Sequence, residues 1–158
     1  MKILEELTGK APVRLEDVAG LDVACPCGRR HRLSLEALVN RRGCAEEAGA
    51  FLAQRGFGRA WLIADQRTYE AAGRRVERAC RASGIAVKAS VLPAEPPPHA
   101  DRDALGRLAF DLEAGGLPVI AVGSGTVTDL ARFLAHRTGA PLVVVVATAP
   151  SMDGYTSS

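Results

Sequence analysis

A run of small and hydroxyl-bearing residues, Gly123-Ser124-Gly125-Thr126-Val127-Thr128-Asp129, lies between an apolar segment and an amphipathic one. Glycine lets a backbone turn sharply and lets an anion approach without meeting a Cβ atom. The first amides of a helix that follows such a turn lack intrahelical partners and lie at the positive end of its dipole, where phosphate oxygens are favoured. The run therefore predicts a phosphate-binding turn at the carboxyl end of a strand.

The same residues also allow a plainer interpretation. A tight turn in which Thr126 and Asp129 form a helix capping box would have this composition without binding anything. The run departs from the dinucleotide-binding pattern G-x-G-x-x-G, because Thr128 stands where the third glycine would be. The spacing alone leaves dinucleotide binding and a structural turn both open.

Asp65 closes a short apolar run earlier in the chain. A carboxylate there can accept hydrogen bonds from both ribose hydroxyls and would repel a 2′-phosphate, which favours NAD over NADP. The structural alternative is an N-cap for a helix that begins near Arg67. Residues 148–153, after a valine-rich run, could position a polyol and a nicotinamide, although such residues also make ordinary loops.

Cys25, Cys27 and His31 bring two thiols and an imidazole close together in the sequence. A structural zinc ion takes four ligands, and only three candidates lie here, since nothing in the sequence places Cys44 as a fourth. The pattern favours a structural turn over a metal site.

The elements that position these residues alternate along the chain. Apolar runs predict strands at 60–65, 85–92, 118–122 and 142–146, and apolar residues at helical spacing predict helices over 45–55, 69–80, 104–112 and 127–134. This alternation predicts an α/β fold, a Rossmann-like doubly wound, mainly parallel sheet with helices on both faces. We expect residues 31–39 as an edge strand. We also expect an N-terminal segment at 1–57 and a dinucleotide-binding region at 58–158, as one domain overall.

Composition excludes several classes of protein. The chain has 158 residues, 47% of them hydrophobic and 24% charged, a balance typical of a globular domain and not of a disordered chain. No run approaches the ~18 apolar residues of a membrane span, and the first residues lack the apolar core of a signal peptide. A net charge of +2 and 4% aromatics argue against nucleic acid as a partner. We expect a cytoplasmic protein that associates with neither membrane nor nucleic acid.

Two of these motifs resemble a known family. The glycine-containing run and Thr148-Ala-Pro-Ser-Met-Asp-Gly-Tyr155 are similar to those of the sn-glycerol-1-phosphate dehydrogenases, within the iron-containing alcohol dehydrogenase and dehydroquinate synthase-like superfamily. The Cys-Pro-Cys-Gly…His segment at 25–31 and the Ala-Asp…Thr-Tyr…Ala-Gly pattern at 64–73 resemble bacterial members. The resemblance implies reversible hydride transfer between NAD(P)H and dihydroxyacetone phosphate, which gives sn-glycerol 1-phosphate, and it allows a homo-oligomer.

The resemblance also implies roles for individual residues. Asp65 would hold the adenosine ribose, and Asp153 would bind the glycerol phosphate substrate near the nicotinamide. The other residues expected to bind NAD or NADP are Gly123, Ser124, Gly125, Thr126, Val127, Asp129, Thr148, Ser151 and Ser157.

A divalent metal, usually zinc, is held in this family by an Asp and two His of a helical C-terminal domain, and it polarises the substrate oxygen. His31, His99 and His136 lie outside any such motif, so we assign no metal ligand and no catalytic residue to this chain. We expect the truncated, cofactor-binding part of the enzyme, inactive alone. The alternatives are a dehydroquinate synthase-like or polyol dehydrogenase relative, and a non-catalytic nucleotide-binding module.

Overall fold

The computed structural model describes residues 9, 14–25, 27–112 and 116–150 of the chain. Its contacts divide the chain into two compact units, with the boundary between Cys44 and Ala45. The helix after this boundary belongs to the second unit, whereas the division expected after residue 57 groups it with the N-terminal segment. Over the described ranges, no helix is both long enough and apolar enough to cross a bilayer.

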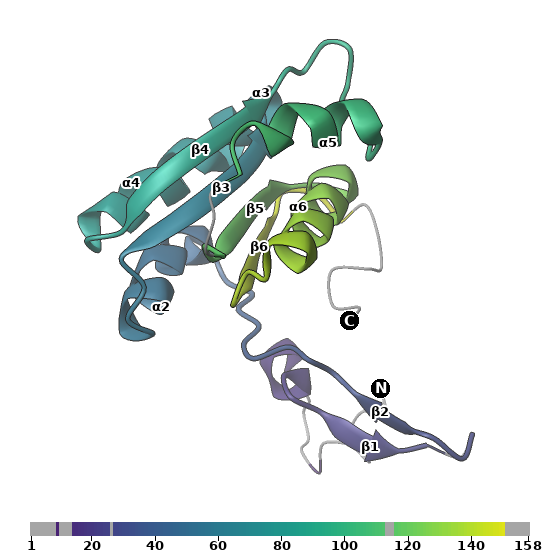
Figure 1. The fold of residues 1–158 in the computed structure, drawn as a ribbon. Coiled ribbons are helices and arrows are strands. Elements are labelled where there is room, and N and C mark those ends of the chain that lie inside the picture. Colours follow the sequence, from purple (N-terminus) through teal and green to yellow (C-terminus); the bar gives the residue numbers. More distant parts are fainter. Residues whose placement is uncertain (1–8, 10–13, 26, 113–115, 151–158) are drawn as a thin grey trace. The chain divides into compact units, whose positions relative to one another are not determined.

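A sheet of four parallel strands forms the centre of the second unit (Figure 1). The two central strands are buried along nearly their whole length, as expected for parallel strands with helices on both faces. The order in space is β4-β3-β5-β6, which one sequence could not reveal. The strands are β3 (Arg59–Asp65), β4 (Ala86–Leu92), β5 (Val119–Gly123) and β6 (Val143–Ala147).

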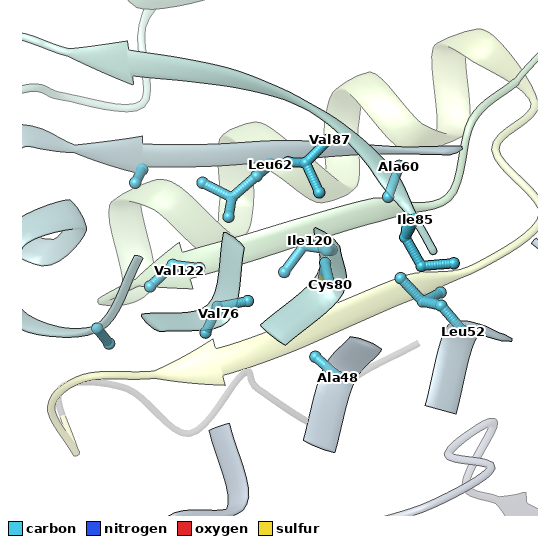
Figure 2. Packing of buried hydrophobic residues seen from close by; sticks show 12 residues of the cluster. Ala48, Leu52, Ala60, Leu62, Val76, Cys80, Ile85, Val87, Ile120 and Val122 are labelled. Atoms are coloured by element: carbon cyan, nitrogen blue, oxygen red, sulfur yellow. The ribbon is translucent and has the colours of Figure 1, made fainter. Parts of the chain in front are cut away.

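Two hydrophobic clusters cover the two faces of this sheet. On one face, side chains of α2 and α4 such as Leu52 and Val76 pack with Leu62 and Ile120 of the central strands (Figure 2). On the other face, α5 and α6 pack against alternate residues of the same strands, including Ile63. The predicted α/β class is confirmed. The helices are α2 (Glu47–Gln54), α3 (Gln66–Thr68), α4 (Arg74–Ala82), α5 (Arg102–Ala109) and α6 (Gly125–Thr138).

Two predicted helices differ in detail from the expectation. The helix after β3 contains a π-helical turn, η3 (Tyr69–Gly73), between α3 and α4. A Cβ atom at Gly73 would lie 2.6 Å from Cδ2 of Tyr69, so glycine leaves room for that ring. The helix predicted over 104–112 is too long at its end, because α5 stops at Ala109 and the tight turn after it leaves Leu112 38% exposed.

The N-terminal unit contains a short antiparallel hairpin of β1 (Asp22–Ala24) and β2 (Arg30–Arg32), after the 3-10 helix η1 (Leu15–Val18). The predicted edge strand at 31–39 is wrong in both extent and pairing. Strand structure ends at Arg32 and pairs with β1, not with the four-stranded sheet. The physical reason is that β2 is exposed at every residue and has no apolar face to lay against a sheet.

Candidate functional site at the carboxyl edge of the sheet

The order in which successive strands are added to the sheet reverses beside β3. The chain passes from β3 to β4 on one side and then returns to place β5 on the other side of β3. Ala64 pairs with Val122. The last residues of the two strands, Asp65 of β3 and Gly123 of β5, therefore lie at the same level of the sheet. In open α/β sheets, ligands bind at the carboxyl ends of the strands where the order reverses. We call Asp65, residues 123–126 and Thr148 the switch edge.

The glycine-containing run begins at the last residue of β5 and leads directly into α6. Ser124 is the N-cap of α6, with extended backbone angles, and the helix begins at Gly125. Both the backbone N–H and the Oγ1 hydroxyl of Thr128 donate to the Ser124 carbonyl, at 3.1 and 3.0 Å. The Ser124 side chain accepts no hydrogen bond from the helix. The first turn of this 14-residue helix is therefore not capped by its own N-cap side chain.

The capping box expected from Thr126 and Asp129 is wrong. The helix begins before Thr126, which is already a helical residue and cannot act as the N-cap. Asp129 is exposed on the helix surface. Its carboxylate lies one turn into α6, so any contact with a ligand at the N-terminus would have to come from a side chain that reaches back toward it.

Gly123 and Val127 show that part of this motif serves packing. A Cβ atom at Gly123 would lie 2.6 Å from Cβ of Val127 and 2.7 Å from its Cγ2. Val127 is fully buried in the cluster beneath α6. Its side chain therefore fills the core at the strand end, and only its backbone could contact a ligand.

Asp65 is 8% exposed and acts as the N-cap of the helix that follows β3. Its Oδ1 accepts from the Thr68 backbone N–H at 2.9 Å, and its own N–H donates to Thr68 Oγ1 at 3.1 Å. The N-cap role that the sequence left open is confirmed. Among the residues that the structure describes, the cap contact engages Oδ1, which leaves the other carboxylate oxygen, Oδ2, as an acceptor for a ligand.

The loop after β6 is joined to the glycine turn by the backbone. Thr148 N–H donates to the Gly123 carbonyl at 3.1 Å, and Thr148 itself is exposed. Asp65, residues 123–126 and Thr148 thus come from three adjacent strand ends. The predicted site residues Ser151, Asp153 and Ser157 lie outside the described residues.

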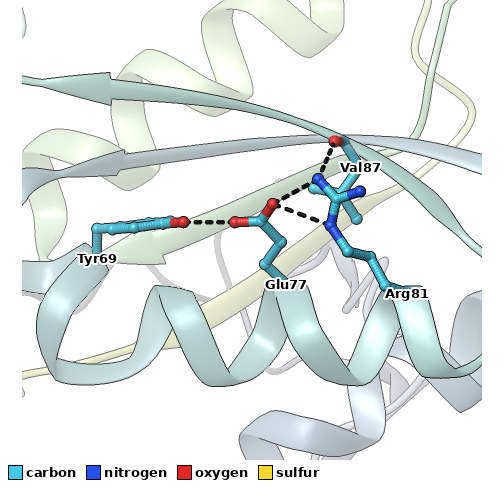
Figure 3. A network of polar contacts seen from close by, with 4 residues as sticks. All are labelled: Tyr69, Glu77, Arg81 and Val87. Carbon is cyan, nitrogen blue, oxygen red and sulfur yellow. Dashed lines mark hydrogen bonds and ion pairs between the residues drawn. The ribbon is translucent and has the colours of Figure 1, made fainter.

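A polar network holds the helical segment that follows Asp65, and no pattern in the sequence indicated it. Tyr69 donates its hydroxyl to Glu77 at 2.5 Å, and Arg81 Nη2 donates to Glu77 at 2.7 Å and to the Val87 carbonyl at 3.3 Å (Figure 3). The hydrogen bond to Glu77 raises the pKa of Tyr69. Burial opposes ionisation of Glu77, but its hydrogen bonds with Tyr69 and Arg81 prevail and lower its pKa. The network therefore joins the π-turn to α4 and β4.

A second group of reactive side chains lies in the N-terminal unit. Ligand atoms of Cys25, Cys27 and His31 all lie within 4.8 Å of one another. The hydrogen bonds from Cys27 to Cys25 lower the pKa of the Cys25 thiol. Cys44 is not in this group and donates its thiol to the Val39 carbonyl at 3.6 Å.

Comparison with known proteins defines the class. Residues 39–158 match the sequence profile of the family described as iron-containing alcohol dehydrogenase. The chain belongs to this family.

Individual relatives make the likeness more specific. The chain is 31% identical over 136 residues to glycerol-1-phosphate dehydrogenase (NAD(P)+) of Halalkalibacterium halodurans, over 84% of this chain and 34% of that protein. It is 33% identical over 131 residues to the protein of the same name from Bacillus velezensis, over 82% of this chain and 33% of that protein. The chain therefore spans about a third of the length of these relatives.

Among solved structures, glycerol dehydrogenase from Schizosaccharomyces pombe has a similar fold, with a TM-score of 0.54 at 17% identity. The match covers 65% of this chain and 25% of that one. At this identity the likeness concerns the fold alone.

Proposed function

We propose that this chain supplies the dinucleotide-binding part of an NAD(P)-dependent glycerol-1-phosphate dehydrogenase. The observation that carries the proposal is the meeting of the Asp65 carboxylate and the Gly123 turn at the point where the strand order reverses. The names of the bacterial relatives support the particular substrate, dihydroxyacetone phosphate or sn-glycerol 1-phosphate.

The switch edge fits a dinucleotide in two respects. The N-terminus of α6 carries the positive end of the helix dipole and is not capped by the Ser124 side chain, and the pyrophosphate would lie there over residues 123–126. The oxygen of Asp65 that the helix cap does not use would accept from the ribose hydroxyls. When bound, the nicotinamide supplies the hydride; the residues of this chain bind and orient the coenzyme.

Asp65 also bears on the choice of coenzyme. Its carboxylate would lie beside the 2′-position of the adenosine ribose, where NADP carries a phosphate. Two negative groups in contact at a largely buried position repel each other strongly. We therefore propose a preference for NAD, with Thr148, Ser151 and Ser157 as further coenzyme contacts and Asp153 as a substrate contact.

The metal that the family implies does not fit the residues described at this edge. The described part of the chain contains one group of three potential metal ligands, and that group is the Cys25, Cys27 and His31 cluster of the other unit. We therefore derive no polarisation of the substrate oxygen from this chain. We propose that the chain binds coenzyme without turning over substrate.

Calorimetric titration with coenzyme fragments tests the binding proposal. ADP-ribose contains the ribose and pyrophosphate that the switch edge would hold, whereas nicotinamide mononucleotide contains neither the adenosine ribose nor the pyrophosphate. We expect the 158-residue chain to bind NADH and ADP-ribose and to bind nicotinamide mononucleotide at least tenfold more weakly. Equal affinity for the two fragments, or no heat with NADH, would overturn the proposal.

A further inference from the structure

The turn of the β1–β2 hairpin brings its reactive side chains to one place. Val23 pairs with His31 across the hairpin, which places His31 close to the turn. The Cys25 N–H donates to the Arg29 carbonyl at 2.8 Å, and the Gly28 N–H donates to the Cys25 carbonyl at 3.0 Å. Gly28 has φ of 83°, a left-handed conformation that glycine adopts without strain. The backbone therefore folds tightly back at the two cysteines.

The three ligand atoms have the spacing of a shared ion. The Cys27 sulfur lies 3.2 Å from Nε2 of His31, and all three ligand atoms lie within 4.8 Å of one another. Tetrahedral zinc, with bonds of ~2.3 Å to sulfur and ~2.0 Å to nitrogen, separates a sulfur from a nitrogen by about 3.6 Å and two sulfurs by about 3.8 Å. Shifts of a few tenths of an ångström to about 1 Å would place all three on one ion.

A backbone amide already supports one of the sulfurs. The Cys27 N–H lies 3.5 Å from the Cys25 sulfur, at hydrogen-bonding distance for sulfur. This contact orients the Cys25 side chain toward the turn. Hydrogen bonds that orient metal ligands in this way are part of most metal sites.

Hydrophobic burial does not account for the order of this hairpin. None of residues 14, 16–25 and 27–44, whose side chains the structure describes, is buried, and the strands contain three residues each. An isolated two-stranded hairpin is marginal in water, and its ion pair between Arg30 and Asp22 is exposed and adds little. Small units without a core are commonly stabilised by a disulfide or a metal.

We propose that Cys25, Cys27 and His31 bind one zinc ion, which cross-links the hairpin turn. Two thiolates and an imidazole form a soft donor set that suits zinc over magnesium or calcium. Binding displaces the protons of any thiols still protonated and oxidises nothing, so no further reactant is required. These residues supply three ligands and leave the fourth position to water or to a ligand from elsewhere. The site is independent of the coenzyme proposal.

Metal analysis of the whole chain tests this site. The 158-residue chain is reduced with a phosphine, incubated with zinc and desalted, and its zinc content is measured by elemental mass spectrometry. We expect one zinc per chain. We expect Cys27→Ser and His31→Ala each to lower the zinc affinity at least tenfold. Cys44→Ser, a cysteine outside the group, is the matched control and should retain the metal.

Two further measurements separate zinc binding from other outcomes. Cobalt(II) added to the wild-type chain should give thiolate charge-transfer absorption that zinc then abolishes. Far-ultraviolet circular dichroism should show that the variants keep the helices of the α/β unit. A wild-type chain that holds no more zinc than the Cys27→Ser variant would overturn the proposal. So would a Cys25–Cys27 disulfide that persists after reduction and excludes the metal.

Discussion

Asp65 and Gly123 end neighbouring parallel strands at the same level of the sheet, one residue beyond the paired Ala64 and Val122. The segment after Asp65 leads to the helices on one face, and the segment after Gly123 leads to α6 on the other face. The two segments of the chain therefore diverge beyond the strand ends. This divergence gives a carboxylate and a helix N-terminus a common edge, and the ligands of open α/β sheets bind at such an edge.

Two substitutions of Asp65 separate its structural role from its charge. Asp65→Ala removes the acceptor for the Thr68 N–H and should lower the free energy of unfolding by about 0.5–2 kcal/mol. Asp65→Asn keeps a capping acceptor and should cost much less. Urea unfolding measures both. Equal losses in the two variants would contradict the capping role as the source of the effect.

The same Asp65→Asn variant tests coenzyme selection. Without the negative charge, we expect the NADH affinity to fall about tenfold, since a hydrogen bond to a charged acceptor is worth ~1.5–3 kcal/mol. NADPH affinity should fall less or rise, because the repulsion of its 2′-phosphate is gone. Calorimetric titration with each coenzyme measures the ratio. An unchanged ratio of the two affinities would show that Asp65 does not lie beside the ribose.

Gly123→Ala tests the packing at the start of α6. The new Cβ would lie 2.6 Å from Cβ of Val127, so we expect destabilisation of about 1–3 kcal/mol. Gly106→Ala, in the exposed middle of α5 with open space around it, is the matched control and should stabilise by about 0.5–1 kcal/mol. If the crowding is specific, the double variant Gly123→Ala with Val127→Ala should lose less than the sum of the two single losses.

Glu77 makes the free energy of unfolding of the α/β unit depend on pH in the acidic range. Its pKa in the folded chain is lowered below the usual 4.5, so its contribution is present above that pH and is lost as the pH falls through the folded value. We expect Glu77→Gln to flatten the fall in stability below about pH 4.5. Glu95→Gln removes the same charge from a side chain that is 76% exposed and serves as the comparison. Unfolding curves measured at several pH values compare them.

The chain alone should not catalyse the reaction of the family. With dihydroxyacetone phosphate, zinc and NADH supplied, we expect no NADH oxidation above the rate without protein. The reason is that the described residues form no cluster of metal-ligating side chains at the switch edge. Absorbance of NADH follows the reaction, and glycerol serves as a second substrate. Measurable turnover would mean that the chain contains catalytic groups that we have not assigned.

The strands and helices of the α/β unit were largely predictable because their residues are consistent at several levels. Runs such as residues 60–64 are apolar on both faces, and helices with apolar residues at helical spacing follow them. The capping box at Thr126 could not be judged from composition, since the sequence does not fix which residue of Ser124, Gly125 and Thr126 begins the helix. Sequence also favoured the wrong extent for the strand at 31–39.

The two candidate sites depend on pairings between distant segments, which the sequence does not encode directly. The switch edge requires β5 to lie beside β3 and not beside β4. The cluster of Cys25, Cys27 and His31 requires the register that pairs Val23 with His31. In the sequence alone, the same three residues offered too few ligands to favour a metal.

Nuclear magnetic resonance of the 15N-labelled chain during titration with NADH tests the central claim most directly. We expect the largest shifts at the amides of Asp65, Ser124, Gly125, Thr126 and Thr148, with little change in the β1–β2 hairpin. A coenzyme site at the switch edge would be contradicted if no shifts appear at a saturating concentration of NADH. It would also be contradicted if the shifts are confined to residues away from the strand ends.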